Sequence, residues 1–289
     1  GLVLMGIGGG AYEACMSSII SHLDSNKSMN MLYASFGLGS LVAPFIIGSF
    51  ARTQVDWNLY YWLPFSLVLL TMFCHFFLFK DYVLPSDEGA THRGTARSRF
   101  AQTSRARVTW IGATLTILSF AIFYIVSNWL TTYLLNLKGV QPDASRYHLS
   151  VFFAGMVSGR IFFSLPFVHI RDRIGNTLLL GAFCGTSALL WKVNSNTSSW
   201  VAVALGGFFL GPNTPGILYI VSTRVSPNLK ETVMSIIIGL GLVGAILGPL
   251  LFGMAAGKVG LQVFPGVVIT LSMISALVYW SVPPREKRD

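Results

Sequence analysis

The sequence predicts an all-α fold, a polytopic membrane protein built as a bundle of about nine hydrophobic helices. Only 11% of the 289 residues are charged and 53% are hydrophobic, whereas soluble domains carry about 25% charged residues. The apolar residues come in uninterrupted blocks of roughly 20, the length that spans a bilayer as an α-helix. The blocks lack period-2 alternation, so helices are favoured over a barrel.

Nine spans are expected, at residues 1–23, 29–50, 57–79, 108–135, 148–169, 174–193, 200–222, 232–256 and 262–282. All connectors between them are short and polar except one, whose arginines, serines and glycines are typical of a flexible basic linker. The chain therefore divides into three spans within 1–79, the linker at 80–107, six spans within 108–282 and a tail at 283–289.

The distribution of charge predicts the orientation in the membrane. In a soluble protein the net charge of +9 would suggest a nucleic-acid partner, but here the basic residues lie between hydrophobic blocks, so none is expected. If the linker is cytoplasmic, fourteen of the 20 Lys and Arg residues lie on that side and five on the other, as the positive-inside rule requires. The tail is then cytoplasmic. No Cys/His cluster has metal-ligand spacing, and no metal or cofactor is expected.

Two pairs of spans repeat a pattern of glycine, proline and polar residues. A glycine seven positions before a polar residue marks both Glu13 and Asn213, and a proline four positions before a glycine marks both Pro44 and Pro249. The offsets, 200 and 205 residues, indicate a duplicated chain. Three spans precede the Asn213 span in its copy and none precedes the Glu13 span, so we expect an N-terminally incomplete chain of three helices plus six. The expected packing or hinge positions are Gly37, Gly39, Pro44, Pro212, Pro215 and Pro249.

The run Arg171, Asp172, Arg173, Ile174 and Gly175 lies between two expected spans, and it resembles a loop motif of the major facilitator superfamily. The segments Gly6–Glu13 and Asn30–Pro44 resemble the fourth and fifth helices of the fucose–galactose–glucose:proton symporters and their fungal relatives. The segments Asn128–Leu134 and Gly155–Arg160 resemble the seventh and eighth.

This resemblance implies two parallel six-helix halves, of which the chain would hold helices 4 to 12. It also implies that the loop from Arg171 to Gly175 latches one conformation on the cytoplasmic side, and that Glu13 matches a helix-4 glutamate that contacts substrate. Sugar-type members often have an acid before the helix-7 tryptophan. This chain has Tyr124, Ser127 and Asn128 before Trp129 instead, which departs from the sugar pattern.

Two charged residues within expected spans are candidates for the transport site. Glu13 is the only one of the eleven acids in the middle of a span, where a carboxylate is costly unless it faces a cavity or a partner. It could carry a proton or bind substrate, or it could be a helix-packing acid. Arg160 lies about midway along its span and could bind substrate, pair with Glu13 across a cavity, or be satisfied by backbone carbonyls.

Polar residues near prolines and aromatic rings complete the candidate site. Asn213 lies between two prolines that free backbone carbonyls, which is typical of a helix lining a site, although a simple kink is the alternative. Tyr124, Asn128 and Trp129 could offer hydrogen bonds and a stacking face, while Trp129 could equally be an interfacial tryptophan. Asn196 begins a glycosylation sequon on the expected outer side.

The function expected from these features is secondary active transport of a small organic solute by alternating access, proton-coupled, with uptake of a sugar-like solute. Proton-driven efflux of a metabolite or drug is an alternative, and a transporter-like receptor or sensor is another. No enzyme constellation is present in the sequence, so no enzymatic activity is expected. The expected partners are the solute, protons and the bilayer. We expect a monomer, and a plasma-membrane location rather than an organelle membrane.

Overall fold

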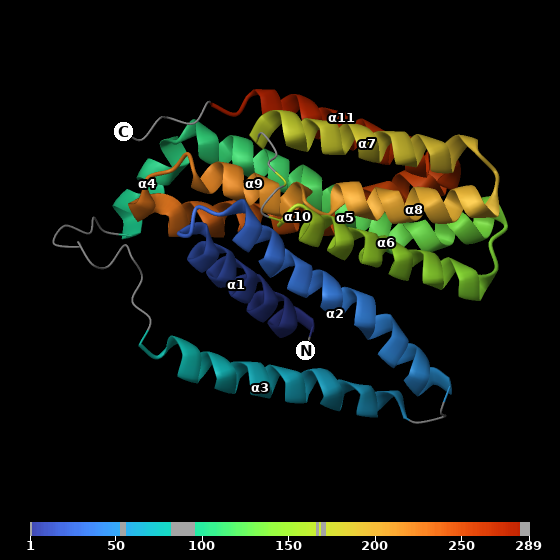
Figure 1. Cartoon of the computed structure of the whole chain (residues 1–289), viewed down its shortest axis with the longest axis horizontal. Coiled ribbons are helices and arrows are strands. Elements are labelled where there is room, and N and C mark those ends of the chain that lie inside the picture. Colours follow the sequence, from blue (N-terminus) through green and yellow to red (C-terminus); the bar gives the residue numbers. More distant parts are fainter. Residues whose placement is uncertain (1, 53–55, 82–95, 166–167, 169–171, 284–289) are drawn as a thin grey trace.

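A computed structural model describes residues 2–52, 56–81, 96–165, 168 and 172–283 (Figure 1). The α-helices are α1 Leu2–Ser21, α2 Asn26–Arg52, α3 Trp62–Phe79, α4 Ala96–Arg105, α5 Arg107–Lys138, α6 Pro142–Phe162, α7 Asp172–Lys192, α8 Asn196–Leu210, α9 Asn213–Ser222, α10 Lys230–Val259 and α11 Phe264–Trp280. Short 3₁₀ turns lie at Trp57–Tyr61, Pro227–Leu229 and Leu261–Val263. No strand occurs in the described ranges, and the all-α class is confirmed.

Each expected span corresponds to helix. Within the described residues, six stretches are long and apolar enough to cross a membrane: Asn58–Phe79, Arg107–Lys138, Arg173–Lys192, Asn196–Ser222, Pro227–Val259 and Leu261–Trp280. The other three expected spans correspond to α1, α2 and α6, which carry the polar side chains of the site described below.

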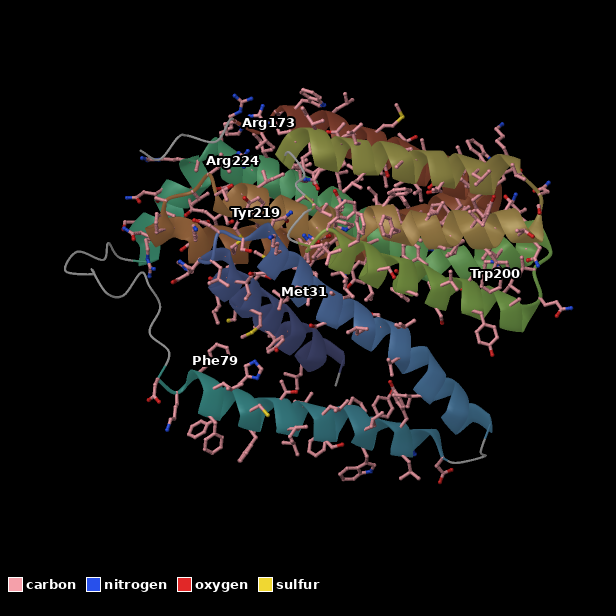
Figure 2. All side chains as sticks on the ribbon, viewed as in Figure 1. Met31, Phe79, Arg173, Trp200, Tyr219 and Arg224 are labelled. Carbon is pink, nitrogen blue, oxygen red and sulfur yellow. The ribbon has the colours of Figure 1, made fainter. Side chains whose placement is uncertain are left out.

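The helices α5 to α11, called here the C-terminal bundle, pack tightly around a shared apolar core (Figure 1). Helices α1 and α2 lie across one side of this bundle, α1 against α10 and α2 against α6 and α9. Helix α3 runs apart from the bundle and contacts α1 through His75, whose Nε2 lies 3.3 Å from the hydroxyl of Tyr12; no residue in α3 is buried. Its side chains project in all directions in Figure 2, where Phe79 is labelled, as expected of a helix that is apolar on every face.

Two stretches differ from the sequence prediction. The span expected at 200–222 is two helices, because Pro212 and Pro215 lack the amide hydrogens that a continuous helix would need at the break after α8. The linker expected to be flexible over 80–107 contains helix α4, and an extended residue, Ala106, separates it from α5. Docking of α4 on α5 and α10 stabilises a segment whose propensity alone is weak.

Glycines allow α6 and α8 to approach closely enough for the site to form. A methyl group on Gly159 would lie 2.2 Å from the carbonyl oxygen of Phe208, and one on Gly207 would lie 2.0 Å from that of Phe152. Such contacts are sterically forbidden, so only glycine permits this spacing, as in other close-packed membrane helices. The crossing brings the C-terminal end of α6 against the break between α8 and α9, and Arg160 lies there in the last turn of α6, not midway along the span as expected.

Candidate functional site

A cavity of about 40 Å³ lies where α1 and α2 meet the C-terminal bundle. Its walls combine one acid, one arginine, aromatic rings and two hydroxyls: Glu13, Tyr33, Phe36, Ser119, Phe120, Phe123, Tyr124, Met156, Arg160, Leu210 and Thr214. A water needs roughly 10–15 Å³ of such space, so the cavity holds about three waters and not a monosaccharide. In this conformation the cavity is therefore too small for a monosaccharide.

Glu13 lies in this cavity wall. The hydroxyl of Tyr33, on α2, donates a hydrogen bond of 2.9 Å to Glu13 Oε1. Ser17 Oγ, one turn further along α1, lies 3.4 Å from the same hydroxyl. A carboxylate within a membrane helix is tolerated only with such partners, and the location agrees with the expectation that Glu13 faces a cavity.

Arg160 is 3% exposed and is held by backbone carbonyls on two sides. Its Nε donates to the carbonyl of Gly211 at 2.9 Å, and its Nη1 donates to the carbonyl of Tyr33 at 2.5 Å. The Gly211 carbonyl is available because Pro215, four residues on, has no amide hydrogen to offer it. A methyl group on Gly37 would lie 3.2 Å from Nη1, so this glycine allows α2 to reach the guanidinium.

No direct ion pair joins Glu13 to Arg160 within the part of the chain described here. Tyr33 connects them instead: its side chain bonds the acid, its carbonyl bonds the arginine, and the guanidinium lies 5.6 Å from its ring centre. No local pattern singles out Tyr33 in the sequence. Its role depends on the crossing of α2 over α6, for which an isolated tyrosine offers no signal.

Asn213 lies behind the cavity wall and does not line it. It is 1% exposed, donates to Ser119 Oγ at 2.9 Å and accepts from the hydroxyl of Tyr279 at 2.9 Å. Ser119 in turn lies 2.8 Å from the hydroxyl of Thr214. Asn213 thus positions the two hydroxyls, of Ser119 and Thr214, that do line the cavity.

The three candidate site residues on α5, Tyr124, Asn128 and Trp129, do not all reach the cavity. Tyr124 lines the cavity. Asn128 is exposed, and its amide donates to the carbonyl of Tyr124 at 2.8 Å. The indole of Trp129 donates to the carbonyl of Pro249 at 3.3 Å and packs on Phe252, toward α10. Neither Asn128 nor Trp129 is among the cavity-lining residues, because their positions on α5 direct them to the exterior and to α10.

Of the remaining expected positions, all but Arg171 lie within the described residues. Asp172 begins α7 and Arg173 and Gly175 lie in its first turns, whereas Arg171 falls outside the described residues. Gly37 makes a close approach, since a methyl group there would lie 2.7 Å from Val157, while a methyl group on Gly39 would meet open space. Pro44 lies within α2 and Pro249 within α10. Asn196 begins α8, at the end of the bundle where Trp200 is labelled in Figure 2.

A second contact joins α1 and α2 to the bundle at the end that carries α4. Lys230, at the start of α10, has a side chain only 2% exposed, and its Nζ lies 2.5 Å from Asp24 Oδ1 and 3.1 Å from the carbonyl of Ser21. Asp24 has a φ of 46°, a left-handed conformation that aspartate tolerates better than most residues. Sequence reasoning treated both residues as connector residues and missed the pair.

Beside this pair, His22 Nε2 lies 3.9 Å from Glu231 Oε1. Burial, and then the nearby charge of Lys230, lower the pKa of His22 below its usual value. The imidazole is therefore neutral at pH 7.

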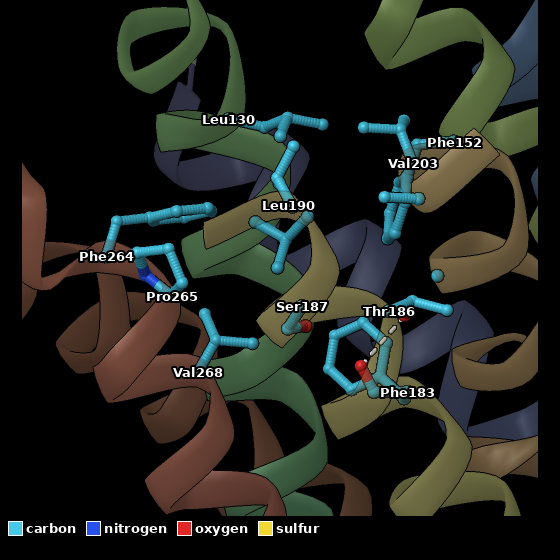
Figure 3. Close-up of a pocket in the computed structure, with 13 residues that line it drawn as sticks. Leu130, Phe152, Phe183, Thr186, Ser187, Leu190, Val203, Phe264, Pro265 and Val268 are labelled. Atoms are coloured by element: carbon cyan, nitrogen blue, oxygen red, sulfur yellow. Dashed lines mark hydrogen bonds between the residues drawn. The ribbon is translucent and has the colours of Figure 1, made fainter. Parts of the chain in front are cut away.

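A smaller cavity of about 30 Å³ lies entirely inside the C-terminal bundle (Figure 3). Its walls are mostly apolar, including Leu130, Phe183, Leu190 and Val268. The hydroxyl of Thr186 donates to the carbonyl of Phe183 at 2.8 Å, which satisfies it locally. With only the hydroxyls of Thr186 and Ser187 in its lining, this space offers a polar solute few partners.

Comparison with known proteins places this arrangement in context. The Major Facilitator Superfamily profile matches residues 1–204. The glucose/mannose transporter GlcP of Bacillus subtilis is 25% identical over 285 residues, covering 94% of this chain and 68% of that protein. The fucose:proton symporter FucP of E. coli superposes with a TM-score of 0.72 at 11% identity, covering 92% of this chain and 73% of FucP. The human organic anion transporter MFSD10 superposes with a TM-score of 0.73 at 16% identity, covering 92% of this chain and 67% of MFSD10. At these identities the two structures are similar in fold.

Proposed function

The chain belongs to the Major Facilitator Superfamily, and from this premise we propose that it carries a neutral, sugar-like solute by alternating access, coupled to protons at Glu13. Members of the superfamily are integral, multi-pass membrane transporters, so the chain is a transporter and not an enzyme. Its resemblance to GlcP supports transport of a sugar-like solute. The proposal adds the coupling, the residues and the conformational cycle.

The observation that carries the proposal is the hydrogen bond from Tyr33 to Glu13 inside the cavity between α1, α2 and the bundle. A carboxyl group in such a place can exist ionised, when Tyr33 donates to it, or protonated, when it can donate to a solute. Because Arg160 is held by carbonyls and not by Glu13, the acid can change its protonation without breaking the contact between the helices. A proton-coupled site needs an acid that can gain and lose a proton while the helices stay in contact.

The composition of the cavity favours a neutral polyol. Phe36, Phe120, Phe123 and Tyr124 offer faces on which a sugar ring can stack, and the hydroxyls of Ser119 and Thr214 can bond to its hydroxyl groups. An organic anion is the second candidate, since Arg160 lines the same cavity. Two of the five guanidinium N–H groups already donate to carbonyls, and the carboxylate of Glu13 in the same cavity would repel an anion, which makes the neutral solute the better fit.

The small volume of the cavity motivates the alternating-access part of the proposal. A monosaccharide enters only if α1 and α2 move away from the C-terminal bundle. We assign residues 1–79 to one moving half and 108–282 to the other, with the linker 80–107 and the tail 283–289 cytoplasmic. The contact of Asp24 with Lys230 then closes the cytoplasmic side. A monomer in the plasma membrane is the proposed setting, and Arg173 would take part in latching this face.

Glu13→Gln tests the coupling. Purified protein in liposomes would be assayed with radiolabelled glucose, mannose and fucose, for accumulation driven by a pH gradient and for counterflow without one. We expect the variant to lose gradient-driven accumulation almost completely and to retain counterflow, because glutamine keeps the hydrogen bond from Tyr33 but cannot release a proton. Asp56→Asn, which removes an exposed carboxyl away from the cavity, serves as the control.

Two results would contradict the proposal. If wild-type accumulation ignores the pH gradient, proton coupling is wrong. If the three hexoses fail to exchange while an organic anion does, the neutral-solute assignment is wrong and the anion candidate takes its place.

A further inference from the structure

Helix α4 presents a basic, aromatic face at the end of the bundle where α5 begins (Figure 1). Arg97, Phe100, Ala101 and Arg105 are all exposed, and their i, i+3, i+4, i+8 spacing puts them on one side of the helix. Thr103 is fully buried, and α4 packs on α5 and α10. We call the four exposed residues the basic face. It is held in place by docking and left open on its outer side.

The charged side chains of α4 are all basic. Helix α4 contains no aspartate or glutamate, and the exposed Arg107 follows it directly at the start of α5. Phe100 is 58% exposed and Trp110 is 53% exposed, although both are large apolar groups. The indole of Trp110 donates to the carbonyl of Ser104 at 2.7 Å, so its ring is fixed beside the last turn of α4.

We propose that the basic face, with Arg107 and Trp110, is a docking surface for anionic phospholipid headgroups of the cytoplasmic leaflet. The surface lies at the end of the spanning helix α5, which places it at the depth of the headgroups. Guanidinium groups bind phosphate oxygens in pairs, and the two aromatic rings can enter the boundary between headgroups and acyl chains. This inference concerns the lipid partner and is independent of which solute is carried.

Other occupants fit less well. A nucleic acid or acidic peptide would match the arginines but would leave Phe100 and Trp110 in water. A neutral lipid would cover the rings but would leave Arg97, Arg105 and Arg107 without counter-charges. An anionic lipid satisfies both sets of groups at once, because it joins a phosphate to an apolar chain within one molecule.

The test uses brominated lipids, which quench nearby tryptophans. Purified full-length protein would be titrated with brominated phosphatidylglycerol or brominated phosphatidylcholine in detergent, and the signal of Trp110 obtained as the difference between wild type and Trp110→Phe. We expect phosphatidylglycerol to be preferred. Each arginine near an anionic surface contributes about fivefold, so Arg97→Gln with Arg105→Gln should lower the preference by about 25-fold.

Controls separate charge from fold and from position. Arg97→Lys with Arg105→Lys keeps the charge and should retain most of the preference. Lys192→Gln with Lys258→Gln removes two exposed charges at the opposite end of the bundle and should leave the preference unchanged. Equal quenching by both lipids in the wild type overturns the proposal. So does a preference that survives Arg97→Gln with Arg105→Gln in a variant with wild-type thermal unfolding.

Discussion

The two contacts that join α1 and α2 to the C-terminal bundle are built in opposite ways. At the α4 end, Lys230 and Asp24 form a direct ion pair at 2.5 Å, with the lysine almost fully buried. In the centre, Glu13 and Arg160 do not pair, and Tyr33 lies between them. A direct ion pair holds two helices together, but it favours the charged form of both partners. The central contact holds the helices together through carbonyls and leaves the acid free to exchange its proton.

This comparison predicts that the edge contact is the more sensitive to loss of a charge. Asp24→Asn keeps the left-handed conformation but leaves the buried Lys230 without a counter-charge, which should lower the free energy of unfolding by about 3–5 kcal/mol. Lys230→Met leaves only Asp24, which is 29% exposed and can be hydrated, so its cost should be about 1 kcal/mol. Reversible unfolding in detergent, followed by circular dichroism, measures both.

Lys27→Met supplies the matched control, because Lys27 is an exposed lysine near the same turn. It should leave unfolding within experimental error of the wild type. Equal costs for Asp24→Asn and Lys230→Met would show that burial of Lys230 does not govern this contact.

The central contact should instead respond to the backbone. Arg160→Met leaves the Gly211 carbonyl without a partner, whereas Pro215→Ala gives that carbonyl an amide hydrogen of its own. In a double-mutant cycle, the cost of Arg160→Met should therefore be smaller in the Pro215→Ala background, by about 1–3 kcal/mol. Pro249→Ala, in α10, is the control proline and should not change the cost. Additive effects of Arg160→Met and Pro215→Ala would remove the proposed link between the guanidinium and the broken helix.

The two regions also differ in how far the sequence predicts them. The spans are predictable because blocks of about 20 apolar residues have few alternatives to a membrane helix. Glu13 and Arg160 stand out because charges within spans are rare, and the structure puts both in one cavity wall. The edge pair joins residues 206 positions apart in connectors, where charges are ordinary, so no local pattern marks it.

Some residues expected in the site do not line the cavity, and the reason is related. Asn128 and Trp129 share a span with Tyr124, but only the rotation of α5 against α10 decides which of them reaches the cavity. Asn213 is expected in the cavity wall, but its amide bonds to Ser119 and Tyr279, which lie 94 and 66 positions away in the sequence. Tertiary packing, which the sequence does not reveal locally, assigns these roles.

The smallest predicted effect concerns His22, which lies beside the edge pair. Burial and Lys230 lower its pKa in the folded protein, while Glu231 and Asp24 oppose the shift. As the pH falls through about 6.5, the unfolded chain takes up a proton that the folded protein does not, so stability decreases until the lowered folded pKa is reached. His22→Gln removes this pH-dependent loss of stability. Its unfolding temperature, measured from pH 8 to pH 5, should fall less steeply below pH 6.5 than that of the wild type. Parallel curves for His22→Gln and the wild type would mean that burial and the charge of Lys230 do not lower the pKa of His22 in the folded protein.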